Sequence, residues 1–415
     1  MKRILMIAAL AALGFVSCEK QDATVPEEDL IPRKDFALTR AQKDFVQANN
    51  GFALDLFRRV SRDEDGKSLL ISPLSVTIDF GMVNNGAVGK TQQEIYETLG
   101  YRDGSVDGLN DFCRTMMEQS VAVDPSTKLE IANAAIVNKL YPGLKDSFTE
   151  KVKSVYDAEV IYKDFSKEDI RKLVNDWCDQ KTHGMVPELL NQPVKAGEYA
   201  HFLNAVYFKG VWTSKFKKEN TKKETFTRED GSKMTVRMMH QEDRFNFGGI
   251  PDLCSAVCLP YGNQAYRMTL LLPNEGKTLD ELVAALDAET WNSLHLSGSQ
   301  VDVMIPAFET EYSVSLKGIL PEMGIKQAFG GAADFSAMSS TPQLFISDVL
   351  HKAKIKVDEE GSEAAAVTDI VMAYGAAGPV SPPRTLEFHA DHPFLYVISE
   401  VSTDAIYFIG QFTGK

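Results

Sequence analysis

Serine, histidine and acidic side chains, the groups of hydrolytic active sites, are abundant in this 415-residue chain, which holds seven His residues. None of them stands in a motif that pairs a nucleophile with a base. There is no Gly-x-Ser-x-Gly elbow, no His-Glu-x-x-His pair and no phosphate loop. Cys113, Cys178, Cys254 and Cys258 lack partners at zinc-ligand spacing, and the strand-like run from Cys254 to Cys258 is too extended for a disulfide. The sequence therefore predicts no enzyme and no metal site, and four buried free thiols.

Another kind of chemistry is suggested by the segment from Val357 to Pro379, which has features of both a strand and a loop. With a period of two, one small or apolar face is shared by Ser362, Ala364, Ala366, Thr368, Ile370 and Met372, while the charges of Glu363 and Asp369 fall on the other face. Glu-Glu-Gly precedes this stretch and Gly-Pro-Val-Ser-Pro-Pro follows it, which is typical of an exposed loop. The pattern favours a conformational switch, with a permanent strand or a flexible Ala-rich linker as the alternative.

The net charge of the chain bears on which classes of molecule it could bind. The chain carries 44 Lys and Arg against 58 Asp and Glu, a formal net charge of −14. Binding to a polyanion releases counterions only where a basic face is available. We therefore expect no nucleic-acid partner and no attraction to an anionic membrane surface.

The first residues are typical of an export signal. Lys2-Arg3 precede thirteen nearly continuous apolar or small residues, Ile4 to Val16, too few for a transmembrane helix. The small residue Ser17 followed by Cys18 resembles a bacterial lipobox, in which the cysteine is lipidated; the alternative is an ordinary secretory signal with an incidental cysteine. We predict a signal peptide at 1–17 and a lipidated Cys18 with a flexible, acidic tether at 18–38. The expected location is outside the cytoplasm, as a bacterial outer-membrane lipoprotein that is periplasmic or surface-exposed and held to the membrane only by its lipid.

The rest of the chain, residues 39–415, shows no linker or repeat and is predicted to form one large α+β domain. Amphipathic periodicity predicts helices over 39–60, 75–85 and 91–99. Strand patterns dominate later, over 129–138, 201–208, 268–272, 301–305 and 344–358, and over two strands within 394–412 joined at 402–404. Ser72-Pro73 is a typical N-cap with proline at the first helical position.

Several ordered motifs carry a resemblance to a known family. The run from Glu359 to Thr368, Glu-Glu-Gly-Ser-Glu-Ala-Ala-Ala-Val-Thr, resembles the hinge of inhibitory serpins nearly residue for residue. Asn204 to Trp212, Val174 to Trp177 and Phe388 to Phe394 are similar to further motifs of that family. The chain resembles bacterial lipoprotein serpins among the inhibitory members of the family. The resemblance implies a serpin fold with three β-sheets, eight to nine helices and an exposed reactive-centre loop at about 359–387.

The resemblance also implies a mechanism. A serpin is a monomeric suicide substrate without a cofactor: a serine, or also a cysteine, peptidase attacks the loop and forms an acyl-enzyme, and the cut loop then inserts into the central sheet. The target is trapped in a 1:1 covalent complex. A serpin that binds other molecules or acts as a chaperone without trapping is the alternative. The hinge comprises Glu359, Glu360, Gly361, Ser362, Glu363, Ala364, Ala365 and Ala366, and the outward position of Asp369 leaves insertion unhindered.

The same resemblance suggests where the loop is cut and what gates the sheet. Counted from Glu359 with the family's usual spacing, the reactive bond is Gly375–Ala376, or Tyr374–Gly375 if the loop is one residue shorter. The first bond suits an elastase- or subtilisin-like pocket and the second a chymotrypsin-like one. By family position, the residues that control sheet opening, the shutter and the breach, are Ser72, Ser75, Asn204, His351 and Trp212.

Overall fold

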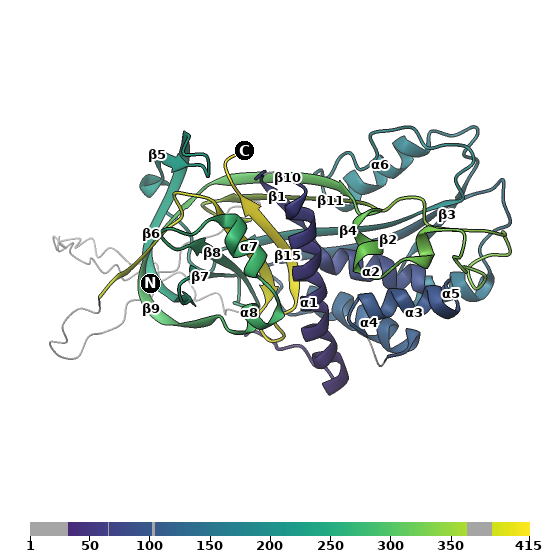
Figure 1. Ribbon diagram of the computed structural model, residues 1–415, viewed down its shortest axis with the longest axis horizontal. Coiled ribbons are helices and arrows are strands. Elements are labelled where there is room, and N and C mark those ends of the chain that lie inside the picture. The colour runs from purple at the N-terminus through teal and green to yellow at the C-terminus, as the bar shows by residue number, and fades with distance from the viewer. Residues whose placement is uncertain (1–31, 65, 102–103, 363–383) are drawn as a thin grey trace, which may run out of the picture. The chain divides into compact units, whose positions relative to one another are not determined.

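The structure, a computed structural model, describes residues 32–64, 66–101, 104–362 and 384–415 (Figure 1). The described residues form nine α-helices: α1 (Arg40–Arg62), α2 (Pro73–Asn84), α3 (Gly89–Thr98), α4 (Val106–Ala122), α5 (Asp146–Tyr156), α6 (Ile170–Lys181), α7 (Leu279–Ala285), α8 (Ala288–Asn292) and α9 (Ile319–Met323). The predicted signal peptide and Cys18 lie outside the described residues.

The first helices begin where local sequence dictates. The Thr39 hydroxyl accepts from the Gln42 backbone N–H while the Gln42 side chain accepts from the Thr39 backbone, a capping box that starts α1. Ser72 caps α2, and Pro73 occupies its first turn, as expected. Before α1 the chain is already packed, because Phe36 is buried and its N–H donates to Ser402. The predicted tether at 18–38 is therefore held to the core by its last residues.

A six-stranded sheet runs in the order β10-β11-β12-β4-β2-β3. Its strands are β2 (Lys128–Asn138), β3 (Glu159–Lys163), β4 (Ala200–Val211), β10 (Phe308–Ser315), β11 (Leu350–Asp358) and β12 (Gly361–Ser362). Helices α2 and α6 lie on opposite faces of β4 (Figure 1). Leu203 and Ala205 pack under α6 in a cluster of their own, whereas Phe208 belongs to the main core.

The second sheet has nine strands in the order β1-β15-β14-β8-β7-β6-β9-β13, with β5 paired to β6. They are β1 (Leu69–Ile71), β5 (Lys222–Thr227), β6 (Lys233–Ile250), β7 (Cys254–Tyr261), β8 (Tyr266–Pro273), β9 (His295–Pro306), β13 (Leu386–His389), β14 (Phe394–Glu400) and β15 (Ile406–Phe412). Two short 3₁₀ turns, η1 (Lys218–Asn220) and η2 (Gln327–Phe329), complete the described elements.

The expected α+β class is confirmed, and hydrogen bonding joins the strands of the described residues into two sheets where three were expected. The cause is the 18-residue strand β6. It pairs with β9 along Met238–Gly249, and its last residues also pair with β7. One long strand thereby connects two groups of strands that shorter strands would leave separate.

Four details differ from or add to the sequence expectations. The strand predicted over 344–358 begins only at Leu350, and the predicted loop range of 359–387 overlaps β13 at its end. Cys113, Cys178, Cys254 and Cys258 are all buried and free, as predicted. None of the helices in the described ranges is long and apolar enough to cross a membrane.

Candidate functional site

Two hinge residues, Gly361 and Ser362, form the short strand β12 between β11 and β4. Ser362 pairs with Val357 on one side and Gly210 on the other, and Gly361 pairs with Asp358 and Val211. Gly361 has a φ of +151°, and a Cβ there would lie 2.1 Å from the Gly210 carbonyl oxygen. Only glycine fits this position without displacing backbone.

Ser362 is almost fully enclosed. It is 1% exposed, and its hydroxyl lies 2.6 Å from the hydroxyl of Tyr261 on β7. The Tyr261 ring stacks on Trp212 with centroids 4.5 Å apart. The Trp212 indole N–H donates to the Asp358 carbonyl over 2.9 Å, and its backbone N–H donates to the Glu360 carbonyl. Trp212, expected at the breach from the sequence, therefore lies directly against the start of the hinge.

The two hinge glutamates are held by basic side chains. Glu359 accepts from Arg237 on β6, and the Glu360 carboxylate lies 3.0 Å from Lys215 and 3.2 Å from Lys218. Burial opposes ionisation of Glu359, yet hydrogen bonds and the charge of Arg237 keep its pKa below the usual range. For Glu360, the hydrogen bond from Lys215 is the main cause of a lowered pKa. The hinge is thus held in place by the ion pairs of Glu359 and Glu360 as well as by the backbone pairing of β12.

Beyond the two residues of β12, the edges of β4 and β11 face each other, and we call this pair of edges the seam. Among the described residues, β4 pairs only with β2 and β12, and β11 pairs only with β10 and β12. A groove occupies the seam, lined by β4 and β11 together with side chains of α2 and α6. Phe202, Asn204 and Val206 of β4 are partly exposed there. Two strand edges with unpaired backbone groups are a template for one more strand.

Four predicted residues meet at this seam. The Ser72 backbone N–H donates to His351 Nε2 over 3.0 Å, and the Ser75 hydroxyl donates to Asn204 Oδ1. The Asn204 amide in turn donates to Asn133 Oδ1 over 2.7 Å. Burial lowers the pKa of His351 to about 4, so this histidine is neutral near pH 7.

Asn133 was missed by the sequence-based prediction. It lies in the alternating strand over 129–138, and a buried amide in such a strand must find a partner, which is the signal that could have identified it. Of the other predicted site residues, Glu363 to Ala366, Tyr374, Gly375 and Ala376 lie outside the described residues. The chain is described again from Arg384, and β13 then pairs in parallel with β9.

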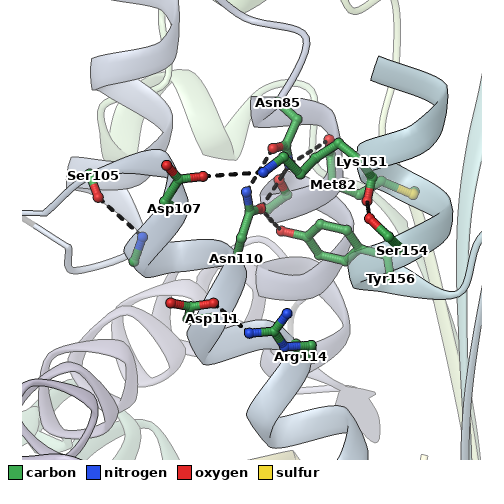
Figure 2. A network of polar contacts seen from close by, with 12 residues as sticks. Met82, Asn85, Ser105, Asp107, Asn110, Asp111, Arg114, Lys151, Ser154 and Tyr156 are labelled. Atoms are coloured by element: carbon green, nitrogen blue, oxygen red, sulfur yellow. Dashed lines mark hydrogen bonds and ion pairs between the residues drawn. The ribbon is translucent and has the colours of Figure 1, made fainter. Parts of the chain in front are cut away.

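A polar network fixes α2 against its neighbours (Figure 2). The Tyr156 hydroxyl of α5 donates to Asn110 Oδ1 over 2.7 Å, and Asn110 of α4 exchanges amide hydrogen bonds of 2.8 Å with Asn85. Asn85 also donates to the Gly81 carbonyl over 2.9 Å. This network holds the helix that forms the floor of the seam.

Within the described ranges, no group of three or more His, Cys, Asp or Glu residues is placed to hold a metal ion. Among the described residues, the candidate site thus consists of the paired hinge residues Gly361 and Ser362, the facing edges of β4 and β11 with no described strand between them, and the polar cluster of Ser72, Ser75, Asn204 and His351. Its geometry is suited to accepting a strand.

Comparison with known proteins gives consistent matches. The family model described as serpin (serine protease inhibitor) matches residues 47–414. Iripin-2 of Ixodes ricinus is 34% identical over 373 residues, covering 88% of this chain and 92% of that protein. A leukocyte elastase inhibitor of Sus scrofa is 33% identical over 376 residues, covering 88% of this chain and 97% of that protein. These are animal proteins and give no support to the expected likeness to bacterial lipoproteins.

Solved structures match equally broadly. Human thyroxine-binding globulin complexed with thyroxine has a TM-score of 0.80 at 27% identity, covering 89% of this chain and 98% of that chain. The thermophilic serpin tengpin in its native state has a TM-score of 0.80 at 26% identity, covering 92% of this chain and 97% of that chain.

Proposed function

This chain belongs to the serpin family, and from that premise we propose that it is an irreversible, suicide-substrate inhibitor of serine, or also cysteine, endopeptidases. It performs no catalysis of its own. Its relatives include a protein named as an inhibitor of leukocyte elastase, which favours an inhibitory role. Elastase- or subtilisin-like and chymotrypsin-like peptidases are the proposed targets.

The observation that carries this proposal is the pairing of Gly361 and Ser362 between β4 and β11, next to a seam in which none of the described residues forms a further strand. Because these two residues already occupy the top of the seam, the loop that follows them is attached at the entry point. Continued in the same register, the ladder would bring Thr368 opposite Asn204 of β4 and His351 of β11. The small or apolar face of the loop would then point toward α2.

The chemistry of trapping begins with an ordinary acylation. The peptidase nucleophile bonds to the carbonyl carbon of Gly375, the Gly375–Ala376 bond breaks, and Ala376 leaves as a new amino terminus. Insertion of about twelve residues at about 1 kcal/mol per hydrogen bond releases on the order of 10 kcal/mol. Native peptidases are stable by only about 5–15 kcal/mol. Insertion is therefore strong enough to distort the attached enzyme before the ester is hydrolysed.

The alternative is a serpin-fold binding protein that is cut without trapping. The likeness to thyroxine-binding globulin, whose structure contains thyroxine, favours this alternative. The small residues that follow Gly361 in the sequence favour inhibition, because a strand that inserts between β4 and β11 must fit there without steric hindrance.

One gel experiment separates the two functions. The protein is mixed with pancreatic elastase, subtilisin or chymotrypsin and then denatured, and a band at the summed mass supports trapping. Ser362→Arg should yield only cleaved protein, because Ser362 is 1% exposed between two strands. Ser362→Ala is the matched control and should still trap. Cleavage alone by all three peptidases at every ratio would exclude the inhibitory function.

The cut itself is identified from the released peptide. Amino-terminal sequencing of that peptide is expected to begin at Ala376, or at Gly375 if the alternative bond is used. Any start before Ser362 or after Pro379 would contradict the proposed reactive bond. Size-exclusion chromatography of the intact protein should give a monomer.

We also propose that the chain is exported and lipidated at Cys18, as a bacterial outer-membrane lipoprotein. The apolar run from Ile4 to Val16 and the Ser17-Cys18 pair support this proposal. Expressed in a bacterial host with radiolabelled palmitate, the full chain should incorporate label and sediment with membranes. Cys18→Ser should abolish both properties, and a labelled Cys18→Ser protein would contradict the assignment.

A further inference from the structure

Asp79 is the one charged residue of α2, and its environment is unusual. Every other residue of this twelve-residue helix is buried. The Oδ1 atom of Asp79 is buried as well and has no hydrogen-bond partner among the residues that the structure describes. A carboxyl oxygen left unpaired in an apolar environment disfavours the ionised form, so the position is costly unless the group serves a purpose.

The position of Asp79 connects it with the seam. It lies one helical turn after Ser75, whose hydroxyl donates to Asn204 on β4, and both residues line the groove between β4 and β11. Helices place side chains four residues apart on one face. Asp79 therefore lies on the groove side of α2, below the space in which no strand is described.

Three other titratable groups line this groove, and none bonds to Asp79. His351 accepts from the backbone of Ser72, Lys352 lies 2.7 Å from Glu311, and Cys178 of α6 is a buried thiol. Burial disfavours the ionised form and raises the pKa of Asp79 to about 7.

We infer that Asp79 couples strand insertion to proton uptake: its carboxyl must be neutral for a strand to close over the groove. The strand that would occupy the groove is the chain's own loop, residues 363–373. The inference therefore rests on the proposed function, and it adds a pH dependence to insertion at the same site. Asp79 acts here as a positioning residue that sets when the groove accepts a strand.

The direction of the coupling follows from solvation. A strand in the groove removes the remaining water from the Asp79 carboxyl and disfavours its ionised form further. Insertion then takes up one proton wherever Asp79 was ionised beforehand. Above about pH 7 the extent of insertion should fall by up to about tenfold per pH unit, and below about pH 6 it should be constant.

The test uses the intact full chain and a synthetic peptide of residues 363–373, acetylated, amidated and fluorescently labelled. The peptide leaves the paired Gly361 and Ser362 in place. Its incorporation is followed by co-migration in native gels between pH 5.5 and 8.5. The wild-type protein should lose incorporation at high pH, whereas Asp79→Asn should incorporate the peptide equally across the range.

Two further variants make the outcome decisive. Asp79→Ala removes the carboxyl with a good helix former and should also be pH-independent, which guards against a folding defect of the first variant. Glu229→Gln removes another carboxyl with a raised pKa, outside the groove, and should keep the wild-type profile.

A wild-type profile that is flat, that rises with pH, or that persists in Asp79→Asn would overturn the coupling. Covalent complexes formed in the gel experiment would leave the proposed function standing in each of those cases. Failure of the peptide to enter at any pH would overturn the groove as an insertion site, and this inference with it.

Discussion

At the scale of single residues, the hinge depends on a conformation that side chains rarely adopt. Gly361 combines its φ of +151° with backbone contact to Gly210 and Val211. A methyl group at this position has no free space, because strand β4 lies directly against it. The glycine is therefore required for β12 to form at all.

We predict that Gly361→Ala releases β12 from the sheet. Strain and steric overlap should cost about 1–3 kcal/mol and favour cleavage over trapping. The measurements are the first unfolding transition in urea and the ratio of cleaved to complexed protein with elastase. Gly318→Ala is the control, since a Cβ there meets nothing within 4 Å. Equal behaviour of the two variants would contradict the role assigned to Gly361.

A second prediction concerns His351, whose pKa is lowered to about 4 by burial. The unfolded chain binds the proton at about pH 6.5, so the native state is fully favoured above that pH and loses stability as the pH falls toward 4. The loss should approach about 3 kcal/mol. His351→Gln keeps an acceptor for the Ser72 N–H and should lack this component when urea transitions at pH 7 and pH 4.5 are compared. Identical pH dependence of both proteins would refute it.

The sequence predicted some of these residues and missed others for a physical reason. Ser72 and His351 could be proposed because they belong to motifs that the family resemblance covers. Asn133, Tyr261 and Asp79 become neighbours of the hinge and the seam only through long-range strand pairing and helix packing. Contacts between residues that lie far apart in the sequence cannot be predicted from a local sequence pattern.

At the scale of elements, the floor of the seam is stabilised independently of the hinge. Figure 2 shows Tyr156, Asn110 and Asn85 linking α5, α4 and the end of α2. This link includes no residue of β4, β11 or β12, so we expect it to contribute to stability without taking part in insertion.

We therefore predict that Tyr156→Phe lowers stability without changing trapping. Loss of the 2.7 Å hydrogen bond to buried Asn110 should cost about 1 kcal/mol. The midpoint of urea unfolding should fall, while the ratio of cleaved to complexed protein stays at the wild-type value. A shift toward cleavage would show that this network controls insertion after all.

Helices and strands could largely be predicted from local patterns. The capping residues Thr39 and Ser72 determine where α1 and α2 begin. Alternation predicted β2, and an apolar run predicted β4. The number of sheets could not be predicted, because it depends on how far β6 continues and on which strands it pairs with. Likewise Gly361 and Ser362 were expected in the loop, and only tertiary pairing places them in a sheet.

At the scale of the whole molecule, no described strand lies between β4 and β11 below β12. Under the proposed function, we therefore expect that the native fold is not the most stable arrangement of the chain. Cleavage within the loop by a peptidase that is not trapped should let the loop pair along β4 and β11. With about 1 kcal/mol for each added hydrogen bond, the gain is on the order of 10 kcal/mol.

We predict that cleaved protein melts at least about 10 °C above intact protein in circular dichroism. Cleaved Ser362→Arg should show a smaller increase, because its bulky side chain obstructs the entry point. Equal melting temperatures of intact and cleaved wild-type protein would exclude insertion. The identity of the peptidase cannot be derived in this way, since it depends on complementarity between the loop and a partner that the chain does not encode.

The reactivity of one buried thiol can be used to monitor the seam. Cys178 of α6 lines the groove, and burial raises the pKa of its thiol to about 12, so it should react slowly with alkylating reagents. Cys113, Cys254 and Cys258 are buried elsewhere. Mass spectrometry of alkylated protein could therefore follow the opening and filling of the seam at a native side chain, without an introduced label.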